Sequence, residues 1–172
     1  LRAVHARLAN RFAIPPSQQD ADALALSVGD WPPFPDTVAA LRRLKSRYRL
    51  LITSNIDRDS FARSSRLLQV EFDAIITAQD VGTYKPAPGH FHRAAETLST
   101  WGIDRDDWLH VAQSLYHDHT PAKRLGIATC WIDRRAGRSG GATPPPPSDL
   151  APDHPVPTLA AFADACEMSP AD

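Results

Sequence analysis

From residue 36 onward, short apolar runs alternate with longer segments of helical character. The apolar runs are bounded by polar residues and turns, as is typical of buried strands, and they are joined through helical patterns rather than tight turns. Strands connected in this way pair in parallel, and continuous apolar strands need helices on both faces. The sequence therefore predicts an α/β fold in which a parallel sheet is covered by helices on both faces. The expected strands lie at 48–53, 73–77, 108–112 and 128–132, and the helices between them at about 58–68, 89–99 and 120–125.

The first 28 residues have a different organisation. Apolar residues recur at helical spacing from Leu1 to Phe12, and a second helical segment runs from about Gln18 to Val28, with Ser17 as its N-cap. The sequence GDWPPFP at 29–35 follows, and its three prolines and one glycine cannot continue a helix. We expect a hinge at this point.

The hinge divides the chain into two expected parts. Residues 1–33 form a small helical part with the hinge, and residues 34–172 form the α/β core. Asp36 is the expected N-cap of the first core helix. The tail at 134–157, rich in glycine and proline, is expected to wrap the surface without packed elements before a last helix near 159–166.

Composition excludes several classes of function. The formal net charge is -1 and charged residues make up 23%, so nothing favours nucleic acid as a partner. The longest apolar runs are far below the ~20 residues that cross a bilayer. We therefore expect a cytoplasmic protein with no membrane or nucleic-acid partner.

Polar residues gather in three loops that follow expected strands. These loops are SNID after Thr53, TAQDVGTYKPAPG after Thr77, and the stretch QSLYHDH after Ala112. Open parallel sheets bind ligands at the carboxyl ends of their strands. The three loops are therefore the expected place for a functional site.

The first two loops carry candidate groups for binding an anion. Ser54 and Asn55 could hold an anionic oxygen together with helix amides, although the same residue types also form turns and cap helices. Lys85 precedes Pro86, which restricts its backbone, so its ammonium would have a fixed direction towards an anion. A solvated surface lysine is the alternative.

The third loop contains Asp118 among several histidines. Three imidazoles and a carboxylate raise the possibility of zinc, but His117 and His119 fall on different faces of a helical segment and the spacing does not match common zinc signatures. His110 lies inside an expected strand and is expected to satisfy a buried hydrogen bond. Asp118 is expected to orient Lys85 or to bind a metal.

The three loops in this order resemble the second, third and fourth motifs of the haloacid dehalogenase superfamily. The similarity is greatest to its type II (S)-2-haloacid dehalogenase-like branch, and it implies a Rossmann-like core with the remnant of a helical cap. It also implies that Ser54 and Asn55 bind the anionic group of a small anionic substrate, that Lys85 neutralises charge at the nucleophile, and that Asp118 is the acidic residue of the fourth motif. Gln113 and Ser114 complete the expected substrate-binding set.

Two departures from the family pattern shape the functional hypothesis. Metal-dependent phosphatases of this superfamily typically carry Gly-Asp where this chain has Ala112-Gln113, and an amide is a poor ligand for magnesium. The family's nucleophilic aspartate lies on a first strand before the cap, and no such strand precedes Leu1. We therefore expect a dehalogenase-like hydrolase without a cofactor, whose nucleophile is absent from this chain, so that the fragment alone is inactive.

Three alternatives stay open. The first is a magnesium-dependent phosphatase in which Asp118 is a metal ligand, and the second is an inactive remnant or binding module. Assembly as a homodimer is also open.

Overall fold

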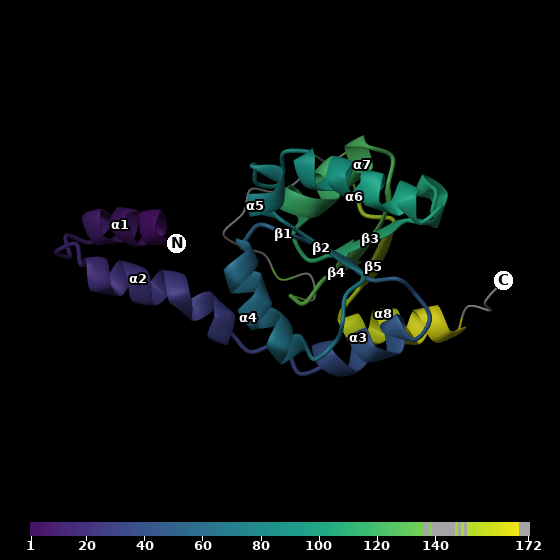
Figure 1. Ribbon diagram of the computed structural model, residues 1–172, viewed down its shortest axis with the longest axis horizontal. Coiled ribbons are helices and arrows are strands. Elements are labelled where there is room, and N and C mark those ends of the chain that lie inside the picture. The colour runs from purple at the N-terminus through teal and green to yellow at the C-terminus, as the bar shows by residue number, and fades with distance from the viewer. Residues whose placement is uncertain (136–137, 139–146, 148, 150, 169–172) are drawn as a thin grey trace.

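The computed structural model describes residues 1–135, 138, 147, 149 and 151–168 (Figure 1). Most of the segment GRSGGATPPPPS, expected to wrap the surface, lies outside these residues. In chain order the elements are α1 (Arg2–Arg11), α2 (Gln18–Leu26), η1 (Ser27–Asp30), α3 (Thr37–Lys45), β1 (Leu51–Ser54), α4 (Arg58–Leu68), β2 (Ala74–Thr77), α5 (Ala78–Val81), α6 (Gly89–Thr100), η2 (Arg105–Asp107), β3 (Leu109–Ala112), η3 (Leu115–His119), α7 (Thr120–Arg124), β4 (Ala128–Ile132), β5 (His154–Val156) and α8 (Leu159–Met168).

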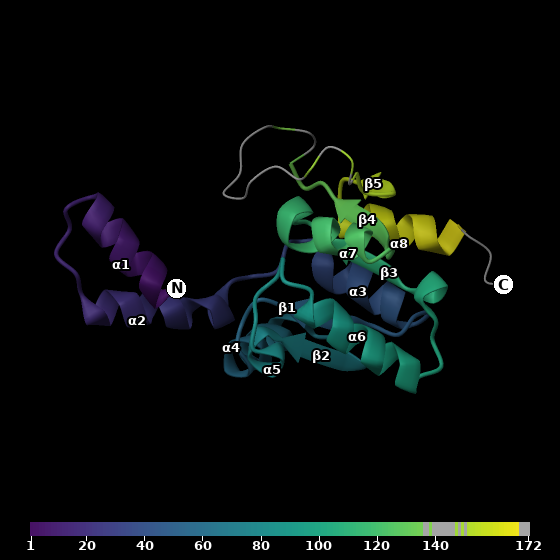
Figure 2. The ribbon, with the colours of Figure 1, turned by 90° about the horizontal axis from the view of Figure 1, so that it is seen from above.

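Helices α1 and α2 form an N-terminal hairpin that projects from the rest of the molecule (Figure 2). Ser17 caps α2 as predicted, because its side chain accepts a hydrogen bond from the Asp20 amide at 3.1 Å. The short helix η1 then packs against α4. Gly29 is buried in this contact, and a Cβ atom added to it would lie 2.6 Å from the Cβ of Arg63. Only glycine allows the two backbones to approach this closely.

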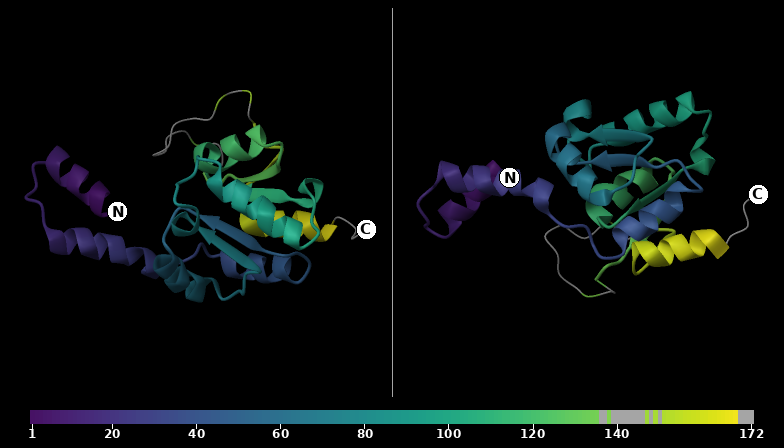
Figure 3. Two further views of the ribbon diagram at one scale, coloured as in Figure 1. Left: turned by 45° about the horizontal axis from the view of Figure 1, so that its top comes forward. Right: turned by 60° about the horizontal axis from the view of Figure 1, so that its bottom comes forward.

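The described part of the core contains five parallel strands in two sheets. β1 pairs with β2, and β3, β4 and β5 form a second sheet in that order (Figure 3). The predicted α/β class with parallel strands is thus confirmed, but the expected single sheet is wrong, because no ladder joins β1 to β3 in the described part of the chain. Side chains bind backbone carbonyl groups near the ends of these two strands. The Lys85 ammonium donates a hydrogen bond to the Thr53 carbonyl of β1, and the His119 ring bonds the Ala112 carbonyl of β3.

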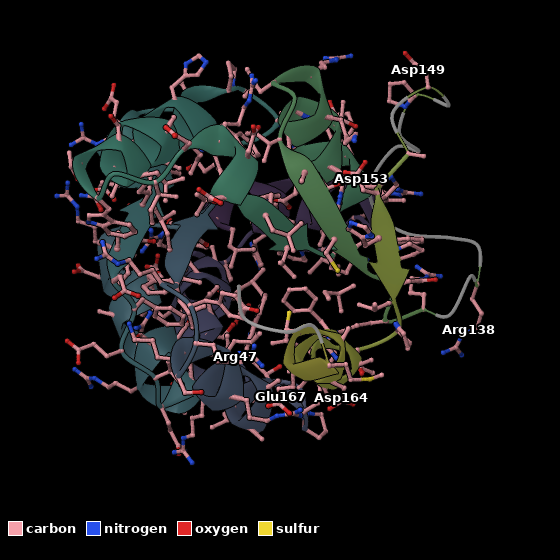
Figure 4. The ribbon with its side chains drawn as sticks, turned by 90° about the vertical axis from the view of Figure 1, so that its right-hand side faces the viewer. Arg47, Arg138, Asp149, Asp153, Asp164 and Glu167 are labelled. Atoms are coloured by element: carbon pink, nitrogen blue, oxygen red, sulfur yellow. The ribbon has the colours of Figure 1, made fainter. Side chains whose placement is uncertain are left out.

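Helices cover both faces of the strands, as predicted. α5, α6 and α7 lie on one side, and α3, α4 and α8 lie on the other (Figure 1). Each side has its own apolar core, one built around Phe91 and Ile127 and the other around Leu44 and Ala163. Arg43 of α3 also binds Asp164 and Glu167 of α8, both at 2.7 Å. Figure 4 labels these two acidic residues on α8.

Two local predictions are wrong. The tail does contain a packed element, since β5 pairs with β4 through His154 to Val156. Asp36 does not cap α3 with its side chain. Its carboxylate instead accepts hydrogen bonds from the Leu159 amide (2.9 Å) and the Ala160 amide (3.2 Å) at the start of α8, and from Arg134 (2.8 Å). The free backbone amides at the start of a helix attract a carboxylate. Asp36 therefore binds the start of α8, a helix far away in sequence, instead of capping α3.

Within the described ranges, no helix combines the length and the apolar character needed to cross a bilayer.

Candidate active site

Asn55 fixes the backbone of Lys85. The loop between α5 and α6 carries Lys85 past the end of β1, where the Asn55 side chain accepts from the Lys85 amide at 2.7 Å and donates to the Lys85 carbonyl at 3.0 Å. The Asn55 amide thus bonds both the N–H and the C=O of Lys85, as the backbone of a neighbouring strand does. Two hydrogen bonds to one residue hold the loop in place, so Asn55 helps to set the direction of the lysine.

Lys85 and Asp118 form a buried ion pair. Lys85 Nζ lies 2.6 Å from Asp118 Oδ1, and it also donates to the Thr53 carbonyl (2.9 Å) and hydroxyl (3.4 Å). Both charged residues are 8% exposed. Burial alone would raise the pKa of Asp118, but the hydrogen bond from His110 and the charge of Lys85 hold that pKa well below its ordinary value. The carboxylate is therefore ionised at neutral pH.

Three buried histidines surround this pair. His110 of β3 lies 3.3 Å from Asp118 Oδ1 through Nε2, which confirms its expected buried hydrogen bond. His90 of α6 bonds the Ser54 carbonyl and His119 of η3 bonds the Ala112 carbonyl, both at 3.0 Å through Nε2. Both of these rings are fully buried, and Nδ1 of each has no partner among the described residues. Burial lowers the pKa of both His90 and His119.

The remaining predicted residues contribute mainly to local geometry. Ser54 is next to Thr53 and so lies beside the ion pair, whereas Gln113 is exposed and its carbonyl accepts from Trp131 Nε1 at 3.0 Å. Ser114 caps η3 by accepting from the His117 amide at 3.2 Å. The substrate-binding roles of Ser54, Gln113 and Ser114 stay predictions.

Sequence reasoning missed the roles of Thr53 and His90. The sequence marks Thr53 only as the end of a strand, although a hydroxyl at the carboxyl end of a strand is well placed to meet a neighbouring cation. His90 follows the motif of Lys85 by five residues, and nothing in the sequence shows that it reaches β1.

A groove lies between the N-terminal hairpin and the core, next to Asn55. It has a volume of about 1060 Å³, and its lining includes Leu26, Trp31, Arg63 and Tyr84. Trp31 and Tyr84 are 56% and 68% exposed. The groove offers an apolar, aromatic surface at the edge of the ion-pair site.

The donor groups of the described residues do not gather into a metal site. Within the described ranges, no three histidine, cysteine, aspartate or glutamate side chains gather as a metal site requires. His110, His117 and His119 bind different partners. Asp118 already accepts from the Lys85 ammonium, whose positive charge would repel a divalent cation at the same carboxylate.

Comparisons with known proteins give a consistent picture. A family model described as haloacid dehalogenase-like hydrolase matches residues 3–126. The (S)-2-haloacid dehalogenase H-109 of Pseudomonas putida is 35% identical over 117 residues, which are 65% of this chain and 50% of that protein. The (S)-2-haloacid dehalogenase of Pseudomonas sp. strain YL is 34% identical over 105 residues, 59% of this chain and 44% of that protein. The chain thus spans about half the length of these curated relatives.

Solved structures share the fold. The L-2-haloacid dehalogenase from Xanthobacter autotrophicus superposes with a TM-score of 0.81 at 21% identity, over 98% of this chain and 75% of the other. A phosphatase from Thermococcus onnurineus superposes with a TM-score of 0.63 at 24% identity, over 92% of this chain and 68% of the other. At these identities the likeness concerns the fold alone.

Proposed function

The chain belongs to the haloacid dehalogenase-like hydrolase family, and from this premise we propose that it serves in the hydrolysis of a small 2-haloacid. In that reaction a carboxylate attacks the carbon that bears the halogen, and halide leaves with the bonding electrons. Water then hydrolyses the resulting aspartyl ester, releasing the hydroxy acid and a proton and restoring the carboxylate. The reaction needs no metal cofactor.

The buried Lys85–Asp118 pair is the observation that carries this proposal. A cation with 8% exposure at the carboxyl end of β1 lowers the energy of negative charge placed beside it, because little solvent screens it there. In the proposed reaction it stabilises the attacking carboxylate, while Ser54 and Asn55 lie near the carboxylate of the substrate. The groove at Asn55 receives the remainder of the substrate.

The proposal includes an organisation of the whole protein. Residues 1–33 belong to a helical cap with its hinge and residues 34–172 to the core. The attacking carboxylate is supplied by a strand outside these 172 residues. Among the described residues, β1 pairs with β2 and β3 pairs with β4, so each of β1 and β3 has one edge without a ladder, which supports this. A cytoplasmic location and a homodimer stay predictions.

Halide release tests the proposal. We expect the product of the whole reading frame to release chloride from (S)-2-chloropropionate in the presence of EDTA, and the 172-residue chain to release none. Lys85→Met should abolish release, whereas Lys45→Met, which removes a lysine paired with Asp73 at the surface, should leave it unchanged. Phosphate release from phosphate esters that is lost with EDTA, without halide release, would favour the phosphatase alternative.

A further inference from the structure

His110 shares an oxygen atom with the catalytic lysine. Its Nε2 atom lies 3.3 Å from Asp118 Oδ1, the same atom that Lys85 Nζ approaches at 2.6 Å. In the described part of the chain, Oδ2 of Asp118 receives no hydrogen bond. The carboxylate is therefore held entirely through one of its two oxygens.

Lysine alone cannot fix the plane of the carboxylate. Its ammonium is a nearly spherical charge on a flexible stem, and it binds a carboxylate over a range of orientations at similar energy. An imidazole N–H donates along one direction in the plane of its ring. His110 is on a strand, and its ring packs edge-on against Phe91, with the centroids 5.0 Å apart. That packing fixes the direction in which Nε2 points.

The other ionisable groups around Asp118 do not compete for this role. His90 from α6 and His119 from η3 both use Nε2 to bind backbone carbonyls. The His119 ring lies 6.4 Å from that of His110 and so supports its position. Lys85 comes from the loop before α6. Of the three histidines, His110 is the one that donates to Asp118.

We propose that His110 is a positioning residue that acts through Asp118: its Nε2–H and the Lys85 ammonium bind the same carboxylate oxygen, and this fixes the plane of the carboxylate against the lysine. The inference rests on the proposed function, because the same ion pair serves both. No contact of His110 with substrate is involved. Its effect is to hold the carboxylate plane in one orientation relative to the Lys85 ammonium.

Nitrogen NMR of the unmodified 172-residue chain gives a first test that no substitution can disturb. We expect Nε2 of His110 to carry a proton at pH 7 and above, since it must donate to the carboxylate. A neutral ring protonated at Nδ1 alone would overturn the proposal.

Hydrogen exchange of the Lys85 ammonium gives the second test. His110→Phe keeps the ring packing but removes the donor, so the carboxylate can rotate and the exchange should become about tenfold faster. His110→Gln places an amide donor near the position of Nε2 and should return the rate towards that of the unmodified chain. His90→Phe is the control, since it replaces another buried histidine that does not bind Asp118, and it should leave the rate unchanged.

Unchanged exchange in His110→Phe, or equal acceleration in His90→Phe, would overturn the positioning role. If His110→Phe does not fold, two other results decide the question. They are the exchange rate of the Lys85 ammonium in His110→Gln and the position of the proton on the His110 ring in the unmodified chain. In the active protein, His110→Phe should lower kcat with little change in KM. A failure of the unmodified protein to release halide would refute the proposed function alone, because neither NMR measurement depends on turnover.

Discussion

Removing one member of the Lys85–Asp118 pair should cost far more than removing both. Asp118→Asn leaves a buried ammonium with neutral acceptors and no counter-charge, and Lys85→Met leaves a buried carboxylate whose remaining donor among the described residues is His110. Breaking a buried pair in this way costs about 3–5 kcal/mol. The double variant contains neither charge, and its apolar methionine fills most of the volume of the lysine. We therefore expect it to lose much less stability than the sum of the two single variants.

The expected coupling energy is about 2–4 kcal/mol, which is the part of each single loss that comes from the uncompensated charge. For a chain of this length, each kcal/mol shifts Tm by roughly 2–4 °C, so the single variants should melt about 6–20 °C lower. Urea unfolding followed by circular dichroism gives the four free energies of unfolding.

A matched cycle on Arg93 and Glu96 serves as the control. These side chains are 61% and 66% exposed and lie 3.0 Å apart on α6. An exposed pair of this kind should couple by less than about 0.5 kcal/mol. Additive losses for Lys85 and Asp118, with a coupling no larger than that of the control, would refute the view that the buried pair is a single electrostatic unit.

Two further predictions concern the buried histidines and the hinge. Burial lowers the pKa of His90 and His119 below the ordinary value of 6.5, so the unfolded chain takes up these protons first as pH falls; stability should be complete above about pH 6.5 and decline below it. Melting curves between pH 8 and pH 5 measure this, and a flat Tm would contradict it. Gly29→Ala places a Cβ 2.6 Å from that of Arg63 and should lower the free energy of unfolding by about 1–3 kcal/mol, whereas an unchanged urea midpoint would show that the hinge shifts freely.

The elements of the core were predictable because each depends on local pattern. Apolar runs such as 128–132 are long enough to identify a buried strand, and Ser17 is a recognisable cap. β5 was missed because it has three residues, and its Pro155 is rare inside sheets. Proline is tolerated there because β5 lies at the end of the order β3–β4–β5.

The site was predictable as a set of loops but not as a set of contacts. Lys85 and Asp118 could be expected to meet, because both follow strands at the same edge of the core. Asn55 binding the Lys85 backbone, and His90 reaching the Ser54 carbonyl, depend on loop geometry across 30 and 36 residues. The division into two sheets depends on which strands are neighbours, and an apolar run does not carry that information.

The bonds of Asp36 have a consequence for the order of events during synthesis. Its carboxylate anchors the core end of the hinge to Arg134 and to the first amides of α8, which are 123 and 124 residues further along the chain. A nascent polypeptide leaves the ribosome from its amino end, so this anchor has no partner until Arg134 has emerged and is complete only after residue 160. The core end of the hinge therefore becomes fixed late relative to the hinge's own synthesis.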